Sequence, residues 1–519
     1  MKKVLGTLVS IFMLLAILGG FKLTAHANSV YDFGIAQADD KTVVINAYYG
    51  DSAEVKIPSK IHGFTVVGIV EDAFYGREDI KKLTLPNTIK DIRAGVFKNT
   101  ALYKNPKNWK NGSLYISNSL IAVKPSEVKD SYQVKEGTTC IADSAFANCT
   151  NLKEITIPKS VKGISSKAFY GCTNLSKVNI SQNLKYVGEK VFEKTAYYKN
   201  SKNWKNNALY LNDCLIQVNS KKIKGSYKVK NGTTYLAESV FKNCKSLTRV
   251  TIPDSVTKIE AGGFEGCSKL KSATLSKKMT KIEAGTFFKC KSLKDIKLSK
   301  NITYIGDMAF ACCESLEEIK LPKNITDLSA MTFMYCKSLK SITIPEGLTY
   351  LNTVVFSDCK NLTKVVIPKS MTSIAEDAFD NCSKLTDITY KGTKAQWKKI
   401  EIWGNMHPSE VIHQAAIHCT DGIVKPTILR TTKIQSVKVN KTSVQLTWKK
   451  TDYIKGYQIQ ISTDNKFKKN VRTIKIKKSM TTKTTINNLK SGKKYYVRIR
   501  TYEGKYHSSW SKISSITTK

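Results

Sequence analysis

The chain has 519 residues, with 84 Lys and Arg against 41 Asp and Glu, which gives a formal net charge of +43. This length would hold roughly three or four average domains, unless the chain is a repeat array that grows in one dimension. Beyond the first residues, no segment is apolar enough to span a bilayer, so the composition excludes a multi-span membrane protein.

The first 27 residues are typical of an export signal. Lys2 and Lys3 precede an apolar stretch, residues 4–20, and Ala25 and Ala27 form a small-x-small cleavage site. A membrane anchor is the alternative, but the apolar stretch is short for one and no stop-transfer charges follow it. We therefore expect cleavage after residue 27, a secreted or cell-surface mature chain, and no membrane span after cleavage.

From residue 73 onward, phenylalanine recurs with a fixed period. Every step is 23 residues except two steps of 49, which is the signature of stacked supersecondary units. The positions are Phe74, Phe97, Phe146, Phe169, Phe192, Phe241, Phe264, Phe287, Phe310, Phe333, Phe356 and Phe379. We expect a solenoid over residues 73–392 and an N-terminal cap over residues 28–72, because an open end would expose the core.

Other positions keep the same period. In one unit, Leu152, Ile155 and Ile157 precede Phe169, and the alternating Ile155–Ile157 pair predicts a short strand with one buried face. Pro158 follows the pair and ends the strand. These side chains must all point inward, and only the stack of units can bury them.

The two 49-residue steps mark inserts near residues 99–140 and 194–235. Tyr103 and Trp109 in the first insert are repeated by Tyr198 and Trp204 in the second, 95 residues later, which indicates a duplicated block. Two interpretations stay open: the tryptophans fill a gap between turns, or they form an exposed aromatic platform for a glycan or a protein.

Nine of the thirteen cysteines follow a repeat phenylalanine by three residues. Equivalent residues on stacked turns lie in one file and point the same way, so we expect reduced structural thiols rather than disulfides or a metal site. This ladder comprises Cys149, Cys172, Cys244, Cys267, Cys290, Cys313, Cys336, Cys359 and Cys382.

Threonine often occupies the outward strand position between two buried residues. The file includes Thr84, Thr156, Thr251, Thr274, Thr343 and Thr389. Threonine suits any exposed strand, yet a regular row of hydroxyls along a solenoid also suits extended binding, and Thr251, Thr274 and Thr343 are our candidates for it.

One carboxylate pair raises the possibility of catalysis. Asp295 and Glu318 occupy the same outward position on adjacent turns, about 5 Å apart by strand spacing, which is the separation used by retaining glycosidases. Lys297 and Lys320 lie two residues further along each strand, so a charge ladder is the simpler interpretation. We predict no catalytic residues, no cofactor and no metal.

The pattern I-x-x-x-A-F-x-x-C-x-x-L-x-x-I-x-I-P resembles the BspA-type bacterial leucine-rich repeat, and residues 141–158 and 374–388 match it closely. The resemblance covers roughly residues 50–392.

Residues 393–425 resemble the unit that closes such arrays. Within them His407, His413, His418 and Cys419 match no zinc spacing, so cap packing is expected.

A different pattern begins at residue 431. Val444, Leu446 and Trp448 alternate with polar residues, as do three other short segments, which predicts an antiparallel β-sandwich over residues 431–519. The segment resembles a fibronectin type III domain, with Trp448 at the core tryptophan position and Tyr495 in the tyrosine corner. It carries 22 Lys and Arg against 3 Asp and Glu.

These features together predict a mainly β protein that binds rather than catalyses. The resemblance implies attachment to extracellular host or microbial proteins or glycans. A wall-associated glycan-binding protein is the alternative, and a polysaccharide-degrading enzyme is a third possibility. The basic C-terminal domain is expected to attract anionic cell-wall polymers, and no nucleic-acid partner is expected outside the cell.

Overall fold

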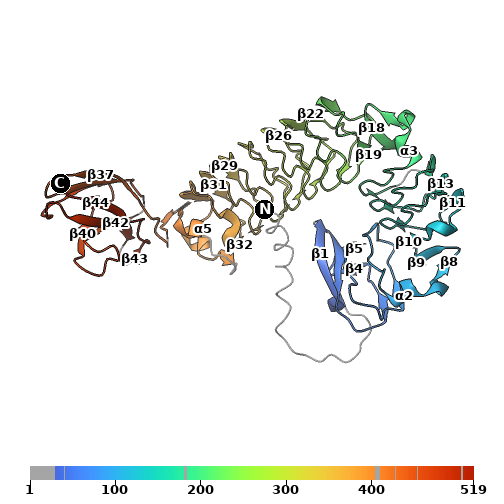
Figure 1. Cartoon of the computed structure of the whole chain (residues 1–519), viewed down its shortest axis with the longest axis horizontal. Coiled ribbons are helices and arrows are strands. Elements are labelled where there is room, and N and C mark those ends of the chain that lie inside the picture. The colour runs from blue at the N-terminus through green and yellow to red at the C-terminus, as the bar shows by residue number, and fades with distance from the viewer. Residues whose placement is uncertain are drawn as a thin grey trace. The chain divides into compact units, whose positions relative to one another are not determined.

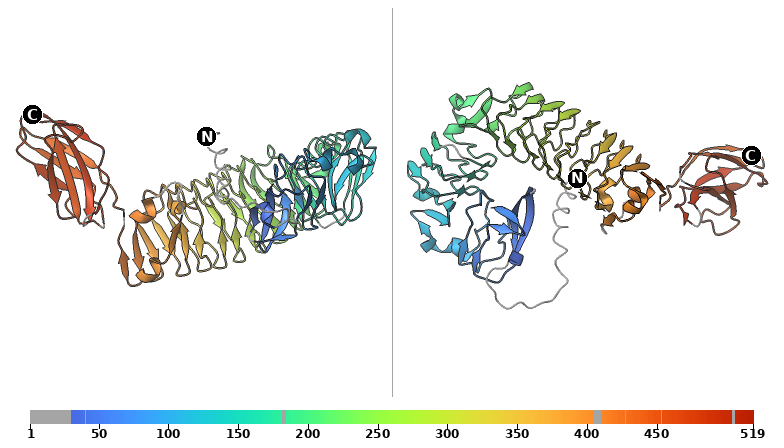
Figure 2. Two further views of the ribbon diagram at one scale, coloured as in Figure 1. Left: turned by 90° about the horizontal axis from the view of Figure 1, so that it is seen from below. Right: turned by 180° about the vertical axis from the view of Figure 1, so that it is seen from behind.

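A computed structural model describes residues 30–39, 41–180, 184–403, 410–426, 428–452, 454–503 and 506–519 (Figures 1 and 2). The predicted export signal, residues 1–27, and His407 lie outside the described residues. Within those ranges, no helix is long and apolar enough to cross a membrane. The chain divides into two compact units, Met1–Ser201 and Lys202–Lys519.

The first unit begins with a small sheet and continues as stacked coils. A hairpin of β1 (Phe33–Asp39) and β2 (Thr42–Tyr48) pairs with β5 (Phe64–Ile69), and β5 pairs with β4 (Lys60–Ile61) and β7 (Asp91–Ile92). The following strands form two parallel files. The first contains β3 (Glu54–Lys56) and β6 (Lys82–Thr84), then β11 (Ser131–Gln133), β13 (Glu154–Ile157) and β15 (Lys177–Ile180); the second contains β12 (Cys140–Ile141), β14 (Gly163–Ile164) and β16 (Tyr186–Val187).

The second unit has two parallel strand files of its own. Its first file contains β20 (Gly225–Lys228), β22 (Leu247–Thr251), β24 (Ser272–Thr274), β26 (Asp295–Lys297), β29 (Ser341–Thr343), β31 (Lys364–Ile367), β33 (Asp387–Tyr390) and β35 (Ala416–Cys419), which pairs antiparallel with β36 (Gly422–Val424). Its second file contains β21 (Tyr235–Leu236), β23 (Lys258–Ile259), β25 (Lys281–Ile282), β27 (Tyr304–Ile305), β28 (Asp327–Leu328), β30 (Tyr350–Leu351), β32 (Ser373–Ala375) and β34 (Glu401–Trp403).

Each predicted insert is an antiparallel meander that rejoins the second file. The first has β8 (Trp109–Lys110), β9 (Ser113–Ile116) and β10 (Ser119–Val123), and the second has β17 (Trp204–Lys205), β18 (Ala208–Leu211) and β19 (Cys214–Val218). The helices are short: α2 (Ala101–Lys104), α3 (Ala196–Lys199), α4 (Lys394–Trp397), α5 (Glu410–Gln414), and the 3-10 turns η2 (Val30–Asp32), η3 (Pro106–Asn108), η4 (Pro125–Glu127), η5 (Ser201–Asn203) and η6 (Glu376–Phe379).

The C-terminal residues form a two-sheet sandwich. One sheet is β37 (Ile434–Val439), β38 (Val444–Trp448) and β41 (Lys483–Ile486); the other is β40 (Arg472–Ile476), β39 (Gly456–Ser462), β42 (Lys494–Glu503), β43 (Tyr506–His507) and β44 (Ser514–Thr517). Trp448 is buried edge-to-face against Tyr457. The hydroxyl of Tyr495 accepts a hydrogen bond of 3.0 Å from the Lys490 N–H, as a tyrosine corner requires.

Stacked phenylalanine rings form the centre of the solenoid. From Phe264 to Phe379, successive rings lie 5.4–5.5 Å apart at interplanar angles of 2–8°, and every ring is buried. The rings sit one strand spacing apart because the 23-residue period returns each position to the same place on the next turn. The predicted mainly β fold, a solenoid followed by a fibronectin-type sandwich, is confirmed.

Each turn also bends sharply on both sides of its phenylalanine. The residues two before and two after the ring adopt left-handed backbone, with φ near +60°, on most turns of the described solenoid. Glycine holds these positions around Phe264, yet Val354 holds one beside Phe356 at φ +59°. A β-branched residue is strained in this region, so the stack imposes the turn even where the local sequence disfavours it.

We expect Phe310→Ala to lower the free energy of unfolding by about 3 to 5 kcal/mol, because it leaves a cavity between the rings of Phe287 and Phe333. Contacts reach only neighbouring turns, so amide exchange should rise around this turn first. Urea unfolding and hydrogen exchange measure both effects. Phe310→Leu, which keeps an apolar side chain in the stack, should lose less; equal losses would contradict ring stacking as the source.

Candidate functional site

In the second unit, outward residues of the first strand file face solvent. Thr274 is exposed and Thr251 half-buried, and the two are aligned in register across β22 and β24. Thr343 on β29 is exposed in the same way. Buried residues such as Ala273 and Ile342 separate the outward positions, so the strand pleat fixes the direction of every candidate threonine.

Acidic and basic side chains on this file pair between successive turns. Glu154 contacts Lys177 at 2.8 Å and Asp130 contacts Lys153 at 2.8 Å, with partners 23 residues apart. The same arrangement joins Glu317 to Lys340. Exposed pairs of this kind contribute little to stability, but they neutralise charge along the surface.

Asp295 and Glu318 are both exposed, and residues 317–321 have no strand geometry beside β26. Strand pairing therefore does not hold the two carboxyl groups at the fixed separation that the sequence pattern suggested.

The tryptophans of the two inserts are half-buried. The indole Nε1 of Trp109 donates to the carbonyl oxygen of Tyr103 at 2.9 Å, and the two rings meet edge to face with centroids 5.2 Å apart. The ammonium of Lys124 lies 5.5 Å from the Trp109 ring centre. Trp204 is half-buried in the same position of the second meander, and burial raises the pKa of both Tyr103 and Tyr198. This geometry matches the gap-filling interpretation better than an open platform.

The second strand file contains a polar network that the sequence did not reveal. Tyr235 donates to a Glu260 carboxylate oxygen at 2.7 Å, and Lys258 contacts Glu260 at 2.6 Å and Glu283 at 3.4 Å. Both glutamates are buried at 6% exposure, whereas Asp295 and Lys297 at outward positions of the first file are exposed. Burial alone would lower the pKa of Lys258, but the two carboxylates outweigh it and raise that pKa.

A threonine also precedes the second-file strand on seven successive turns, and these threonines link the turns. Thr372 donates to the Thr349 carbonyl oxygen through its hydroxyl at 2.8 Å and through its backbone N–H at 2.7 Å. The residues are Thr234, Thr257, Thr280, Thr303, Thr326, Thr349 and Thr372. Their period of 23 could have been found in the sequence, but it was hidden among the many other threonines.

The cysteine ladder is built from thiol-to-carbonyl contacts. Cys313 donates to the Phe287 carbonyl oxygen at 3.3 Å and Cys336 to that of Phe310 at 3.2 Å, always to the phenylalanine 26 residues earlier. The same bond is made by Cys172, Cys267, Cys290, Cys359 and Cys382. All thirteen cysteines, each within the described residues, are free thiols. Cysteine thus fills a small apolar space and satisfies a buried carbonyl.

Two histidines of the closing unit, His413 and His418, each contact a carboxylate. His418 Nε2 lies 2.7 Å from Asp387, and His413 Nε2 lies 3.5 Å from Glu376. The Sγ atom of Cys419 is 3.8 Å from the Ile417 carbonyl oxygen. In the described part of the chain, no group of three or more His, Cys, Asp or Glu side chains is placed to hold a metal ion.

Two family models match the chain. The model of the BspA-type leucine-rich-repeat region matches residues 46–119, 129–231, 217–340 and 306–401, and that of the fibronectin type III domain matches residues 430–517. No curated protein matches the chain.

Several solved structures are similar to the chain. A leucine-rich repeat protein from Bacteroides ovatus has 21% identity and a TM-score of 0.29, covering 67% of this chain and 95% of that one. A leucine-rich cell-surface protein from Faecalibacterium prausnitzii has 23% identity and a TM-score of 0.25, covering 74% and 100%. The pneumococcal vaccine antigen PcpA has 19% identity and a TM-score of 0.28, covering 71% and 93%.

The buried thiols predict that stability depends on pH. Burial raises the pKa of Cys290, Cys313, Cys336 and Cys359 above the ordinary value of about 8.5. The stability they contribute is therefore complete below that value and is lost as pH rises above it, because only the unfolded chain then releases the protons. Urea unfolding under reducing conditions should show a falling free energy between pH 9 and 10, by up to about 1.4 kcal/mol per pH unit for each thiol.

The double variant Cys313→Ala, Cys336→Ala serves as the control. It should be less stable than the parent at pH 7, since two buried side chains are shortened, but its pH slope should be shallower. An unchanged slope would assign the pH dependence to other groups.

Proposed function

The chain belongs to the BspA-type leucine-rich-repeat family, and from this we propose that it is a bacterial surface protein that binds extracellular host or microbial proteins or glycans. Leucine-rich repeats and fibronectin type III domains are scaffolds that are typically non-catalytic, and their combination suggests a surface interaction or adhesion role. Export by the predicted signal of residues 1–27 is part of this proposal.

The exposed first strand file is the observation that supports binding best. Its outward residues are fixed by strand pairing and repeat at the spacing between strands, so they form an extended surface without an ordering cost. Repeat solenoids use such surfaces for large partners. We place the contact surface on the threonines of this file, Thr251, Thr274 and Thr343.

We expect the double variant Thr274→Arg, Thr343→Arg to lose at least about tenfold in binding, because two bulky charged side chains would stand on the contact surface. The measurement is binding of the mature chain to an array of extracellular-matrix proteins and bacterial surface glycans. The strongest wild-type signal on that array defines the probe.

Thr280→Arg, Thr349→Arg is the matched control. Both threonines are exposed, but they precede strands of the second file. This variant should bind within about twofold of the parent. Equal losses in both variants would contradict the assignment to the first file, and release of reducing sugars from a glycan would favour an enzyme instead.

Wall association is a second candidate function, and the charges of the C-terminal domain favour it. Among the described residues, its three acidic side chains are already engaged: Asp452 with Lys450 at 2.7 Å, Asp464 with backbone N–H groups of its own loop, and Glu503 with Lys425 at 3.1 Å. The net charge of +19 therefore has little internal compensation. Such a field attracts anionic wall polymers over a distance that salt shortens.

The mature protein is expected to bind purified cell walls at 0.05 M salt and to elute as salt approaches 1 M, where the screening length is about 3 Å. Replacing five exposed lysines of the sandwich by Gln should shift elution to lower salt. Those lysines are Lys438, Lys441, Lys477, Lys478 and Lys490.

An equal change in charge on the solenoid is the control, made by replacing Lys245, Lys269, Lys271, Lys278 and Lys300 by Gln. It should shift elution less than the sandwich variant does. Elution that does not depend on salt concentration would contradict an electrostatic attachment.

A further inference from the structure

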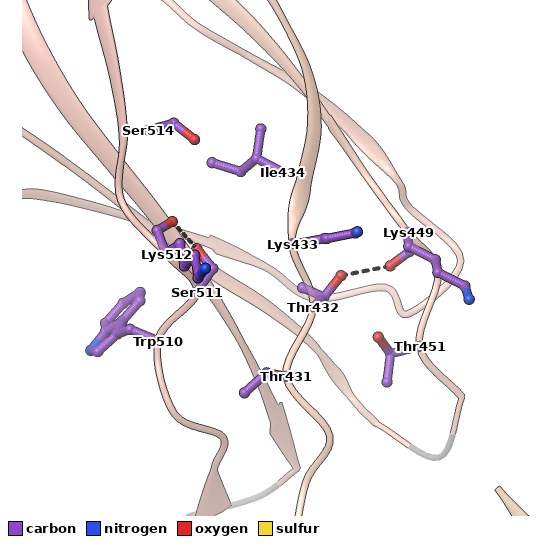
Figure 3. Close-up of a pocket in the computed structure, with 10 residues that line it drawn as sticks. All are labelled: Thr431, Thr432, Lys433, Ile434, Lys449, Thr451, Trp510, Ser511, Lys512 and Ser514. Carbon is purple, nitrogen blue, oxygen red and sulfur yellow. Dashed lines mark hydrogen bonds between the residues drawn. The ribbon is translucent and has the colours of Figure 1, made fainter. Parts of the chain in front are cut away.

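A hollow of about 660 Å³ opens at one end of the fibronectin-type sandwich (Figure 3). This volume lies within the range of sites that hold small molecules or short polymer segments. Its lining comes from three places in the chain, namely the start of β37, the end of β38 and the approach to β44. The lining includes Thr432, Lys433, Lys449, Trp510, Ser511 and Lys512.

Hydrogen bonds hold the walls of this hollow in place. The Thr432 hydroxyl donates to the Lys449 carbonyl oxygen at 2.8 Å, which ties the segment before β37 to the end of β38. The hydroxyl of Ser511 accepts from the Ile499 N–H at 3.1 Å and donates to the Lys512 carbonyl oxygen at 2.9 Å. The backbone that presents the lysines is therefore ordered before any ligand arrives, which lowers the entropy cost of binding.

The aromatic wall is fixed as well. The guanidinium groups of Arg498 and Arg500 lie 4.5 and 4.3 Å from the ring centre of Trp510. The Gln460 and Gln458 side-chain oxygens accept hydrogen bonds from these two arginines and hold them in place. The indole remains half-exposed at the rim of the hollow. A fixed, half-exposed indole supplies apolar contact area beside hydroxyl groups, which is the combination that sugar and polyol units need.

The charge of the hollow has one sign. Lys433, Lys449 and Lys512 are exposed, and in the described part of the chain none of them forms an ion pair. The lining includes no Asp or Glu, and the nearest acidic residue in sequence, Asp452, is held by Lys450. Three uncompensated ammonium groups around one hollow favour an anion, and lysine acts on phosphate as a point charge.

We propose that this hollow binds a segment of an anionic, hydroxyl-rich polymer, with the lysines on its phosphate or carboxylate groups and the Thr and Ser hydroxyls on its sugar or polyol hydroxyls. The proposal rests on the wall-association function above and gives it a defined site. It separates two modes of attachment, since a diffuse positive field would treat all lysines of the domain alike.

The experiment compares two triple variants of the full mature chain. The first changes the hollow, with Lys433→Gln, Lys449→Gln and Lys512→Gln. The second removes the same charge at the opposite end of the sandwich, with Lys438→Gln, Lys441→Gln and Lys490→Gln. The ends are opposite because Ile434 pairs with Trp448, whereas Leu489 bonds Thr442 beside the β37–β38 turn.

Binding is measured at fixed ionic strength to three probes: a delipidated glycerol-phosphate polymer, polygalacturonate and neutral dextran. We expect the hollow variant to lose at least about tenfold in affinity for the charged probes, the opposite-end variant to lose less than about threefold, and dextran not to bind. Preference between the two charged probes assigns phosphate or carboxylate as the recognised group. Unchanged thermal unfolding of both variants excludes a folding defect.

Equal losses in the two variants would overturn the hollow as a site while leaving wall association by diffuse charge intact. If the parent chain bound neither charged probe at any salt concentration, both the hollow as a site and wall association by charge would be overturned. Dextran binding equal to that of the charged probes would overturn the assignment of an anionic ligand.

Discussion

A 23-residue period forces every side chain of the solenoid to lie against its own equivalent. Each residue type must therefore pack against another copy of itself, and only some residue types can do this favourably. Phenylalanine does: rings 5.4–5.5 Å apart and nearly parallel form a continuous apolar column. Cysteine and threonine do because each donates to a carbonyl oxygen one turn earlier, so their columns are chains of hydrogen bonds. Like charges stacked in this way repel, and several turns of the first file instead place Glu against Lys.

The period also explains which parts of the structure could be predicted. Phe310, Cys313 and their equivalents recur as identical letters, so the register and the inward positions follow from the sequence. The second file could not be predicted in this way, because the residue before its buried Leu or Ile changes from turn to turn: Tyr235 is followed by Lys258, and Asp327 comes two turns after Lys281. Burial of Glu260 and Glu283 depends on neighbouring side chains. Val354 at φ +59° shows the same limit, since its own preference is overridden by the stack.

The candidate surfaces differ in how much the sequence revealed. Alternation around Thr274 indicated an outward residue, and Trp448 with Tyr495 indicated the sandwich. The hollow around Trp510 was invisible, because it joins residues 431–434, 449–451 and 510–514, which are distant in the chain and follow no period. Charge composition indicated that the domain attracts anions, but only the assembled sheets place Lys433, Lys449 and Lys512 around one space. A repeat pattern reveals the scaffold from the sequence, whereas sites made by strand ends and loops can be located only in the tertiary structure.

The strands of the solenoid run across the direction in which its turns stack, and this determines how the array responds to mechanical load. Tension along the stacking direction breaks the hydrogen bonds between turns one row at a time, rather than shearing many rows together. Each released turn adds about 80 Å of extended chain, from 23 residues at roughly 3.5 Å each, in place of one strand spacing of ~4.8 Å. The array under tension would therefore lengthen in steps and limit the force that reaches its two ends. Removing the load would let each turn refold on the intact neighbour that remains as its template.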